Sequence, residues 1–154
     1  MPTKSLGPPS GSNNEEIEIE LAPEPSASPS GDAPVVLVVD DDASIRTMLV
    51  HALGKTYTIY EASDGIEAKA VLDAIPLPSA IVCDVMMPRM DGFQLAKQLR
   101  KDKNLSRIPI LFLTAKDGAM DVITGINAGA RHYVTKPFKI AEVVAKVGHM
   151  TGKK

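Results

Sequence analysis

Short apolar runs alternate along this chain with segments whose apolar residues recur at helical spacing. The first run, Val35–Val39, is apolar throughout and mostly β-branched, which is typical of a strand buried on both faces. Apolar side chains then recur every three or four residues over 45–53, which predicts a helix. The same alternation continues toward the end of the chain. It predicts further strands at 57–61, 80–83, 108–113 and 132–135, and further helices at 64–74, 93–99, 118–128 and 140–147.

Five successive strand–helix units predict one α/β domain. Parallel strands need crossover connections, and right-handed crossovers place helices on both faces of a single sheet. The expected fold class is therefore a doubly wound parallel sheet. In such a sheet, ligands bind beyond the carboxyl ends of the strands, so the residues at those ends are the first candidates for a functional site.

Residues 1–34 depart from this pattern. They contain seven of the 12 prolines, no aromatic residue, and one lysine against six acidic residues, which gives this segment a net charge of −5. Such a segment buries too little apolar surface to offset the entropy lost on ordering. We expect a disordered acidic tail rich in Pro and Ser over 1–34 and a folded domain over 35–151. Within the tail, residues 16–21 alternate acidic and apolar side chains, and two interpretations stay open: a solvated acidic segment, or a short motif that adds a strand to a partner's sheet.

The composition excludes several classes of protein. No apolar stretch in the 154 residues reaches the roughly 18 that cross a bilayer, and the first residues lack the apolar core of a signal peptide. A cytoplasmic protein without a membrane span is expected. The single cysteine, Cys83, excludes an intrachain disulfide and a cysteine-rich zinc site. The net charge of −2 argues against nucleic acid as the main partner.

Charged and hydroxyl side chains follow four of the five predicted strands. In chain order they are Asp40-Asp41-Asp42, Asp84, Thr114 and Lys136-Pro137. Each has an ordinary structural explanation, because an aspartate after a strand often caps the next helix, a threonine is common in strands, and a lysine before proline is usually a solvated turn residue. However, the carboxyl ends of parallel strands share one edge of the sheet, so these residues are expected to converge there.

A cluster of carboxylates at one edge needs a cation. Carboxylates that lie close together raise one another's pKa unless positive charge lies among them. A hard dication held by one or two carboxylates, with water and phosphate oxygens completing its coordination, describes Mg²⁺. Lys136 supplies the remaining positive charge. The sequence therefore predicts a magnesium site at this edge of the sheet.

At these same residues the chain closely resembles the receiver domain of bacterial two-component response regulators, of the CheY-like kind. The resemblance extends from Val35 to Gly148 and implies a flavodoxin-like sheet with strand order 2-1-3-4-5. Each of the four segments that carry it lies at an expected strand end. They are Val38-Val39-Asp40-Asp41, Asp84-Val85-Met86-Met87-Pro88-Arg89-Met90-Asp91-Gly92, Leu113-Thr114-Ala115-Lys116 and Tyr133-Val134-Thr135-Lys136-Pro137-Phe138.

The resemblance implies roles for the acidic residues. Asp84 matches the phosphoacceptor, a carboxylate that takes a phosphoryl group from a histidine kinase or a phosphotransfer protein. Asp41 matches the acidic residue that binds Mg²⁺ directly, and Asp40 matches its neighbour, which often acts through water. The backbone carbonyl of Met86 matches a third protein ligand. Asp42 lies one position beyond the acidic pair, and we interpret it as a helix cap or a solvated residue.

The resemblance also implies a switch. Lys136 matches the lysine that pairs with the phosphoryl oxygens, and its bond to Pro137 is expected to be cis. Thr114 matches the hydroxyl that turns toward the phosphate, and Tyr133 matches the aromatic side chain that rotates inward when the threonine moves. The expected output is therefore a change in a protein-docking surface.

The chain ends directly after the last predicted helix, so a single-domain regulator that docks on an effector protein is expected. The implied docking face consists of the fourth helix, the fifth strand and the fifth helix. The protein is then a signalling phosphoacceptor rather than an enzyme, although it assists its own Mg²⁺-dependent phosphorylation and dephosphorylation.

Two other function classes compete with this interpretation. One is an interaction module of the same fold that works without phosphorylation, which is disfavoured because the acceptor position is present. The other is a phosphatase of the haloacid-dehalogenase type, which needs two aspartates separated by one residue after the first strand. Asp40 and Asp42 have that spacing, but the downstream pattern and the short chain argue against it.

Overall fold

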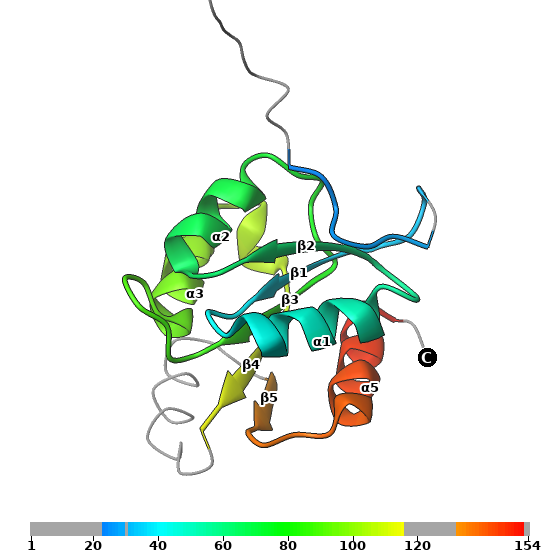
Figure 1. Cartoon of the computed structure of the whole chain (residues 1–154). Helices are drawn as coiled ribbons and strands as arrows, with labels where there is room; N and C mark the ends of the chain where they lie inside the picture. The colour runs from blue at the N-terminus through cyan, green and yellow to red at the C-terminus, as the bar shows by residue number, and fades with distance from the viewer. Residues whose placement is uncertain (1–22, 30, 116–131, 153–154) are drawn as a thin grey trace, which may run out of the picture.

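Five parallel strands form the centre of the structure, a computed structural model that describes residues 23–29, 31–115 and 132–152 (Figure 1). Their order in the sheet is β2-β1-β3-β4-β5, and every pair of neighbours is parallel. This order confirms the expected flavodoxin-like fold. The strands are β1 (Val35–Val39), β2 (Thr58–Ala62), β3 (Ala80–Asp84), β4 (Ile110–Thr114) and β5 (His132–Thr135).

Helices cover both faces of the sheet (Figure 1). One face packs against α1 (Ala43–Leu53) and α5 (Ile140–Thr151), and the other against α2 (Gly65–Leu72) and α3 (Gly92–Arg100). The short 3-10 helix η2 (Leu105–Arg107) follows α3. No helix in the described ranges is long and apolar enough to cross a lipid bilayer.

The two hydrophobic clusters explain why the sequence of β1 is apolar at every position. Successive side chains of a strand point to opposite faces of the sheet. In β1, Val36 and Val38 therefore join the cluster under α1 and α5, whereas Leu37 and Val39 join the cluster under α2 and α3. Because helices cover both faces of the sheet, neither set of alternating side chains can be polar. The alternation of polar and apolar residues that is typical of a strand with one exposed face is therefore absent from β1.

The element boundaries agree with the predicted ones to within two residues at most strand ends. The strand predicted at 57–61 lies at Thr58–Ala62, and the one predicted at 108–113 lies at Ile110–Thr114. Asp42 caps α1, since its carboxylate accepts hydrogen bonds from the backbone N–H groups of Ser44 and Ile45. The interpretation of Asp42 as a helix cap is confirmed. The helix predicted at 118–128 lies outside the described residues.

The structure differs from the expected tail over residues 23–29. This segment lies along the outer edge of β2, where Ala27 forms an antiparallel bridge with Ile59. The Ser26 N–H donates to the Ile59 carbonyl at 2.7 Å, and the Ile59 N–H donates to the Ala27 carbonyl at 2.8 Å. The physical reason is that β2 is an edge strand, so its outer backbone groups are available for hydrogen bonds with another segment. The expectation of a disordered tail came from the composition of residues 1–34, which contains no information about that edge.

Candidate functional site

The carboxyl ends of four strands bring the predicted polar residues to one edge of the sheet. Asp40 directly follows β1, Asp84 is the last residue of β3, Thr114 is the last residue of β4, and Lys136 directly follows β5. These strands are neighbours in the sheet order β1-β3-β4-β5. Their ends therefore converge, as the parallel topology requires.

Three carboxylates form the centre of this site. Asp40, Asp41 and Asp84 each offer an oxygen atom, and these atoms lie within 4.8 Å of one another. Asp40 and Asp84 are buried, whereas Asp41 is exposed. The site is therefore open to solvent on the side of Asp41, and it is closed by the sheet beneath.

Lys136 lies between the two buried carboxylates. Its Nζ atom is 3.2 Å from Oδ1 of Asp84 and 3.6 Å from Oδ2 of Asp40. Its backbone N–H donates to the Thr114 carbonyl at 2.7 Å, which joins the β5 end to the β4 end. The Lys136-Pro137 peptide bond is cis, as the resemblance implied.

Burial and mutual repulsion make the ionised carboxylates of this cluster costly. Burial, followed by the charge of Asp40, raises the pKa of Asp84 to about 6, although the ammonium of Lys136 opposes the shift. Burial also raises the pKa of Asp40, and the hydrogen bond from the Asp42 backbone N–H partly offsets that effect. A single ammonium group therefore does not neutralise the cluster.

A cation fits the arrangement of the donors. Oδ2 of Asp40 is buried and has no hydrogen-bond partner among the described residues. The Lys136 ammonium lies 3.6 Å from this oxygen, beyond hydrogen-bond distance, so a cation bound directly to it would offset the cost of its burial more fully. Two buried carboxylates and one exposed carboxylate supply the oxygen ligands that Mg²⁺ prefers, and the exposed side leaves room for water in its coordination.

The predicted switch residues lie on the two strands beside the cluster. Thr114 is buried at the end of β4. Tyr133 on β5 is paired in register with Phe112 on β4, and the two rings stack with their centroids 6.0 Å apart. Burial raises the pKa of the Tyr133 phenol. The Tyr133 ring is thus packed against the core on one side. Along β5, Tyr133 lies two residues before Thr135, which is paired in register with Thr114.

The loop between β3 and α3 follows Asp84 directly, and a backbone hydrogen bond joins its two ends. Gly92 begins α3 and its N–H donates to the Val85 carbonyl at 2.9 Å. A Cβ atom at Gly92 would lie 2.5 Å from the Asp84 carbonyl oxygen, so only glycine allows this approach. The side chain of Met86, two residues past Asp84, is exposed. Because a thioether has no oxygen, the backbone carbonyl is the only oxygen ligand that Met86 can offer.

Arg89 in the same loop forms an ion pair with Asp64, the residue that caps α2. Arg89 has a φ of 68°, and its guanidinium donates from Nε to Oδ2 of Asp64 at 2.9 Å and also from NH2 to the same oxygen. The hydrogen bond from the Glu67 N–H, together with Arg89, holds the pKa of Asp64 below its usual range. This pair joins the β3–α3 loop to the start of α2.

Two residues near the site have structural roles. Asp91 caps α3 in a reciprocal pair of hydrogen bonds with Gln94. Cys83 is fully buried, and burial raises the pKa of its thiol well above the usual range. A thiol in that state is a poor nucleophile, so Cys83 serves as a small apolar residue of the core. Lys116, the last residue of the third segment that carries the resemblance, lies outside the described residues.

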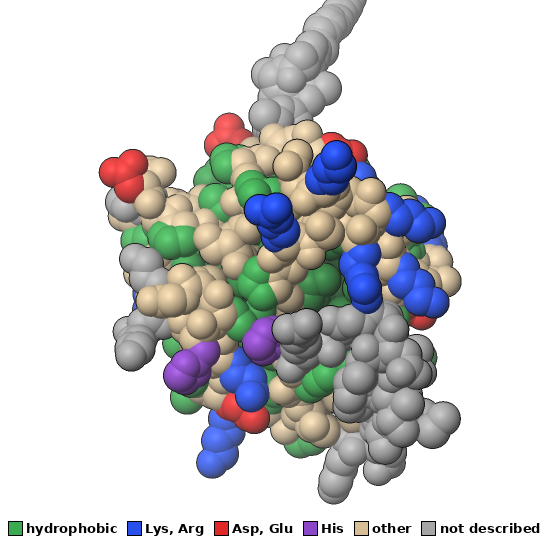
Figure 2. All heavy atoms as spheres, turned by 180° about the vertical axis from the view of Figure 1, so that it is seen from behind, with side chains coloured by type: hydrophobic (Ala, Val, Ile, Leu, Met, Phe, Trp, Pro, Cys, Tyr) green, Lys and Arg blue, Asp and Glu red, His purple; other side chains and the backbone are tan. Residues whose placement is uncertain are grey.

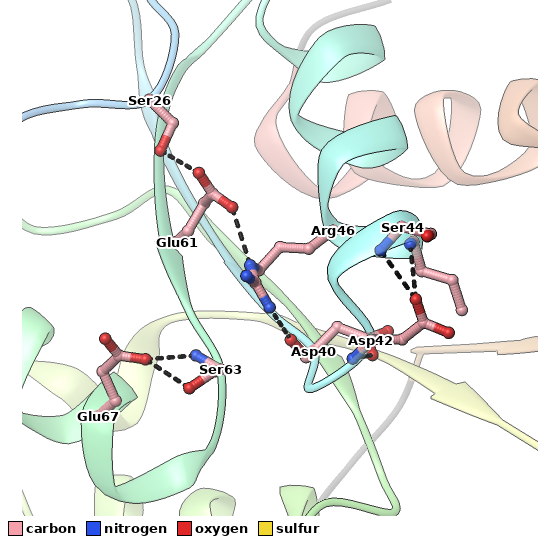
Figure 3. Close-up of polar contacts among 9 residues, drawn as sticks. Ser26, Asp40, Asp42, Ser44, Arg46, Glu61, Ser63 and Glu67 are labelled. Atoms are coloured by element: carbon pink, nitrogen blue, oxygen red, sulfur yellow. Dashed lines mark hydrogen bonds and ion pairs between the residues drawn. The ribbon is translucent and has the colours of Figure 1, made fainter.

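Sequence reasoning missed Arg46 and Glu61, which lie next to the acidic cluster (Figure 3). Arg46 on α1 donates from NH1 to the Asp40 carbonyl at 2.7 Å, and from Nε to Oε1 of Glu61 at 2.9 Å. Glu61 is on β2. The only sequence signal for Arg46 is a basic residue in the second turn of the helix after the acidic run, and such a residue is usually solvated.

Charge is distributed unevenly over the molecule. The acidic cluster occupies the strand-end edge, whereas Figure 2 shows lysine and arginine side chains spread over the half of the back face where α2 and α3 lie. Lys97 and Arg100 in the last turn of α3 belong to that side of the molecule.

Known proteins are similar to this chain in sequence and in fold. The model of the response regulator receiver domain matches residues 36–148. The chain belongs to the response regulator receiver family. This receiver domain is similar to response regulator MprA of Mycobacterium ulcerans (strain Agy99), with 42% identity over 113 residues. It is also similar to the alkaline phosphatase synthesis transcriptional regulatory protein PhoP of Bacillus subtilis (strain 168), with 46% identity over 113 residues.

Both alignments cover 73% of this receiver chain, and they cover 47% of MprA and 46% of PhoP. The chain thus spans about half the length of the curated relatives it matches. Among solved structures, the Vibrio cholerae chemotaxis response regulator CheY4 has 33% identity and a TM-score of 0.71, covering 77% of this chain and 98% of that one. The Francisella response regulator 1452 receiver domain has 35% identity and a TM-score of 0.69, covering 77% and 97%.

Proposed function

We propose that this receiver domain accepts a phosphoryl group on Asp84 from a histidine kinase or a phosphotransfer protein. The observation that supports this most directly is the position of the Asp84 carboxylate, 3.2 Å from the Lys136 ammonium and within 4.8 Å of two further carboxylates. With a pKa of about 6, Asp84 is largely ionised at neutral pH and is therefore available as a nucleophile.

Mg²⁺ is the cofactor in this proposal. Asp40, Asp41 and Asp84 would hold it, with the backbone carbonyl of Met86 as a further oxygen ligand. When bound, the ion neutralises the negative charge that accumulates on a transferring phosphoryl group. The buried Oδ2 of Asp40, which accepts no hydrogen bond among the described residues and has the Lys136 ammonium 3.6 Å away, is the feature of this chain that favours such a ligand set.

The chain's own residues then do the following. An oxygen of Asp84 attacks the phosphorus atom, so that an O–P bond forms while the N–P bond to the donor imidazole breaks and the nitrogen keeps the electron pair. Lys136 lies on the same side of the cluster as Asp84, where its ammonium pairs with a phosphoryl oxygen. Because phosphoryl transfer has a loose transition state, this positioning of charge carries most of the catalysis, and the domain is a phosphoacceptor rather than an enzyme acting on a separate substrate.

Phosphorylation is then transmitted through Thr114 and Tyr133. The Thr114 hydroxyl turns toward the phosphoryl group, and the space that it leaves admits the Tyr133 ring. Shifting a two-state equilibrium from 1:99 to 99:1 needs about 5.5 kcal/mol of differential interaction. Charge-assisted hydrogen bonds of about 1.5–3 kcal/mol each from Lys136 and Thr114, together with the cation, supply energy of that order. The responding surface would include β5 and α5, and its remaining element lies outside the described residues.

The test of this proposal is covalent labelling. After incubation of the full chain with acetyl phosphate and Mg²⁺, we expect intact mass to show one added phosphoryl group. Asp84→Asn should show none, because an amide oxygen is a weak nucleophile. Asp73→Asn is the matched control, since that aspartate is an exposed residue at the end of α2 that pairs only with Lys69 among the described contacts, and it should label like wild type.

Two outcomes contradict the proposal. Labelling that survives in Asp84→Asn would assign the acceptor to another residue. A wild-type chain that takes up no phosphoryl group at any Mg²⁺ concentration would favour an interaction module that works without phosphorylation.

A further inference from the structure

Residues 26–28 add a short antiparallel segment to the edge of the sheet. On its outer side β2 pairs with Ser26 and Ala27 through the two backbone hydrogen bonds to Ile59. Ala27 is packed against the hydrophobic cluster under α1 and α5, so the segment is attached by side chains as well. All three residues precede position 36, where the match to the receiver family begins. We call residues 26–28 the edge segment.

The edge segment contacts the domain through a charged side chain too. Ser26 donates its hydroxyl hydrogen bond to Oε2 of Glu61, while the other carboxylate oxygen of Glu61 accepts from Nε of Arg46 at 2.9 Å (Figure 3). Glu61 therefore has one oxygen engaged by the edge segment and the other engaged by α1. Ser28, by contrast, contacts the Thr58 hydroxyl at 2.8 Å and does not contact Glu61 in any described hydrogen bond.

Arg46 extends this chain of contacts to the acidic cluster. Its NH1 group donates to the Asp40 carbonyl at 2.7 Å (Figure 3). At the other end of the same residue, the Asp40 N–H donates to the Ala62 carbonyl at 3.1 Å. Both backbone groups of Asp40 are thus held, and the peptide that Arg46 fixes is the one that leads into Asp41. The direction of the Asp41 carboxylate depends on that peptide.

We propose that Arg46 is a positioning residue for the acidic cluster, and that the edge segment holds it in place through Ser26 and Glu61. A guanidinium presents its N–H groups in a rigid planar fork, so that Nε and NH1 can contact Glu61 and the Asp40 carbonyl at the same time. Partners behind metal ligands commonly alter metal affinity by about 10–100-fold. This inference rests on the proposed function, because its effect is on the binding of Mg²⁺.

Mg²⁺ alone, without a phosphodonor, tests the proposal. The full chain is titrated with Mg²⁺, and binding is followed through the backbone amide shifts of Asp41 and its neighbours. Arg46→Lys keeps the positive charge but cannot make both contacts, and we expect about tenfold weaker binding. Arg46→Gln is the second variant, and it should bind at least as weakly. Urea unfolding of each variant establishes that it is folded under the titration conditions.

Ser26→Ala and Ser28→Ala separate the contact with Glu61 from the mere presence of the edge segment. Both substitutions remove one hydroxyl from the edge segment, but only Ser26→Ala removes the hydrogen bond to Glu61. We expect Ser26→Ala to weaken Mg²⁺ binding about two- to fivefold. This effect is smaller than that of Arg46→Lys, because Ser26 is one contact further from the Mg²⁺ ligands. Ser28→Ala should leave Mg²⁺ binding unchanged. In Arg46→Lys, adding Ser26→Ala should have little further effect, because residues of one network are not additive.

The outcomes distinguish this inference from the proposed function. If wild type binds Mg²⁺ and folded Arg46→Lys binds it equally well, Arg46 is not a positioning residue, although the proposed function is untouched. If Ser26→Ala and Ser28→Ala bind alike, the edge segment has no part in holding Arg46. If wild type itself does not bind Mg²⁺, the proposed function fails, and this inference fails with it.

Discussion

At the scale of single residues, Asp84 combines a buried position with an ionisable group. Its side chain is 8% exposed, and its pKa is raised to about 6 from the ordinary value of 3.8. The folded protein therefore binds this proton more tightly than the unfolded chain does. As a result, the ionised carboxylate lowers the stability of the cation-free protein progressively as the pH rises from about 4 to above 6.

This charge gives a pH-dependent prediction. Without divalent cations at pH 7.5, we expect Asp84→Asn to be more stable than wild type by about 1–2 kcal/mol, since one pKa unit corresponds to about 1.4 kcal/mol and solvent at the open side of the site screens part of the shift. Toward pH 4 the gain should become small, because Asp84 is then protonated in the folded protein and about half protonated in the unfolded chain. Urea unfolding between pH 4 and 7.5 measures it.

Asp73→Asn again provides the control, because an exposed aspartate should show little pH-dependent gain. A stabilisation by Asp84→Asn of the same size at pH 4 and pH 7.5 would show that the effect is due to packing rather than charge.

At the scale of elements, contacts with the N-terminus of α2 hold the β3–α3 loop in place. The Arg89–Asp64 pair and the hydrogen bond from the Gly65 N–H to the Met90 carbonyl, 3.2 Å long, join it to α2. Arg89 adopts a left-handed backbone conformation, with φ at 68°, which is unfavourable for a residue with a Cβ atom. The ion pair with a buried carboxylate stabilises this conformation.

Two substitutions at Arg89 separate the side chain from the backbone. Arg89→Ala and Arg89→Gly both remove the ion pair, but only glycine relieves the positive φ. We therefore expect Arg89→Ala to be less stable than Arg89→Gly by about 1 kcal/mol in urea unfolding.

At Lys97, inside α3, the same pair of substitutions should give the reverse order, with glycine less stable by about 1 kcal/mol. Equal stabilities of the two Arg89 variants would contradict the assignment of strain to this residue.

At the scale of the whole molecule, the folded unit begins before the part that matches the receiver family. Residues 26–28 lie along β2, and a Cβ atom at Gly54 would lie 2.5 Å from Cβ of Ala27. The end of α1 and the edge segment thus meet without space for an additional methyl group. The close approach depends on a glycine directly after the helix.

Gly54→Ala is expected to displace the edge segment. Because the Ile59 N–H is bonded to the Ala27 carbonyl, hydrogen exchange at the Ile59 amide should be faster in this variant. A loss of one backbone hydrogen bond of about 1 kcal/mol corresponds to roughly fivefold faster exchange. Gly31→Ala is the control, since a Cβ there meets no atom within 4 Å, and exchange should match wild type. Unchanged protection of Ile59 in Gly54→Ala would mean that the edge segment tolerates the additional methyl group in place.

The sequence by itself determined the fold and the residues at the strand ends. Apolar runs separated by helical periodicity specify a parallel sheet, because only a sheet covered on both faces buries such runs. The carboxyl ends of parallel strands share one edge of the sheet. The sequence pattern is therefore enough to predict that Asp40, Asp84 and Lys136 lie close together, as they do in the structure.

The tertiary structure alone decided which side chains support that site. Arg46 and Glu61 are 15 residues apart, Asp64 and Arg89 are 25 apart, and Ser26 and Glu61 are 35 apart. No local pattern encodes these pairs, because each depends on how two elements pack side by side. The position of residues 26–28 along β2 has the same origin. The outer edge of β2 exists only once the sheet has formed, so the composition of the N-terminal segment does not predict that it pairs there.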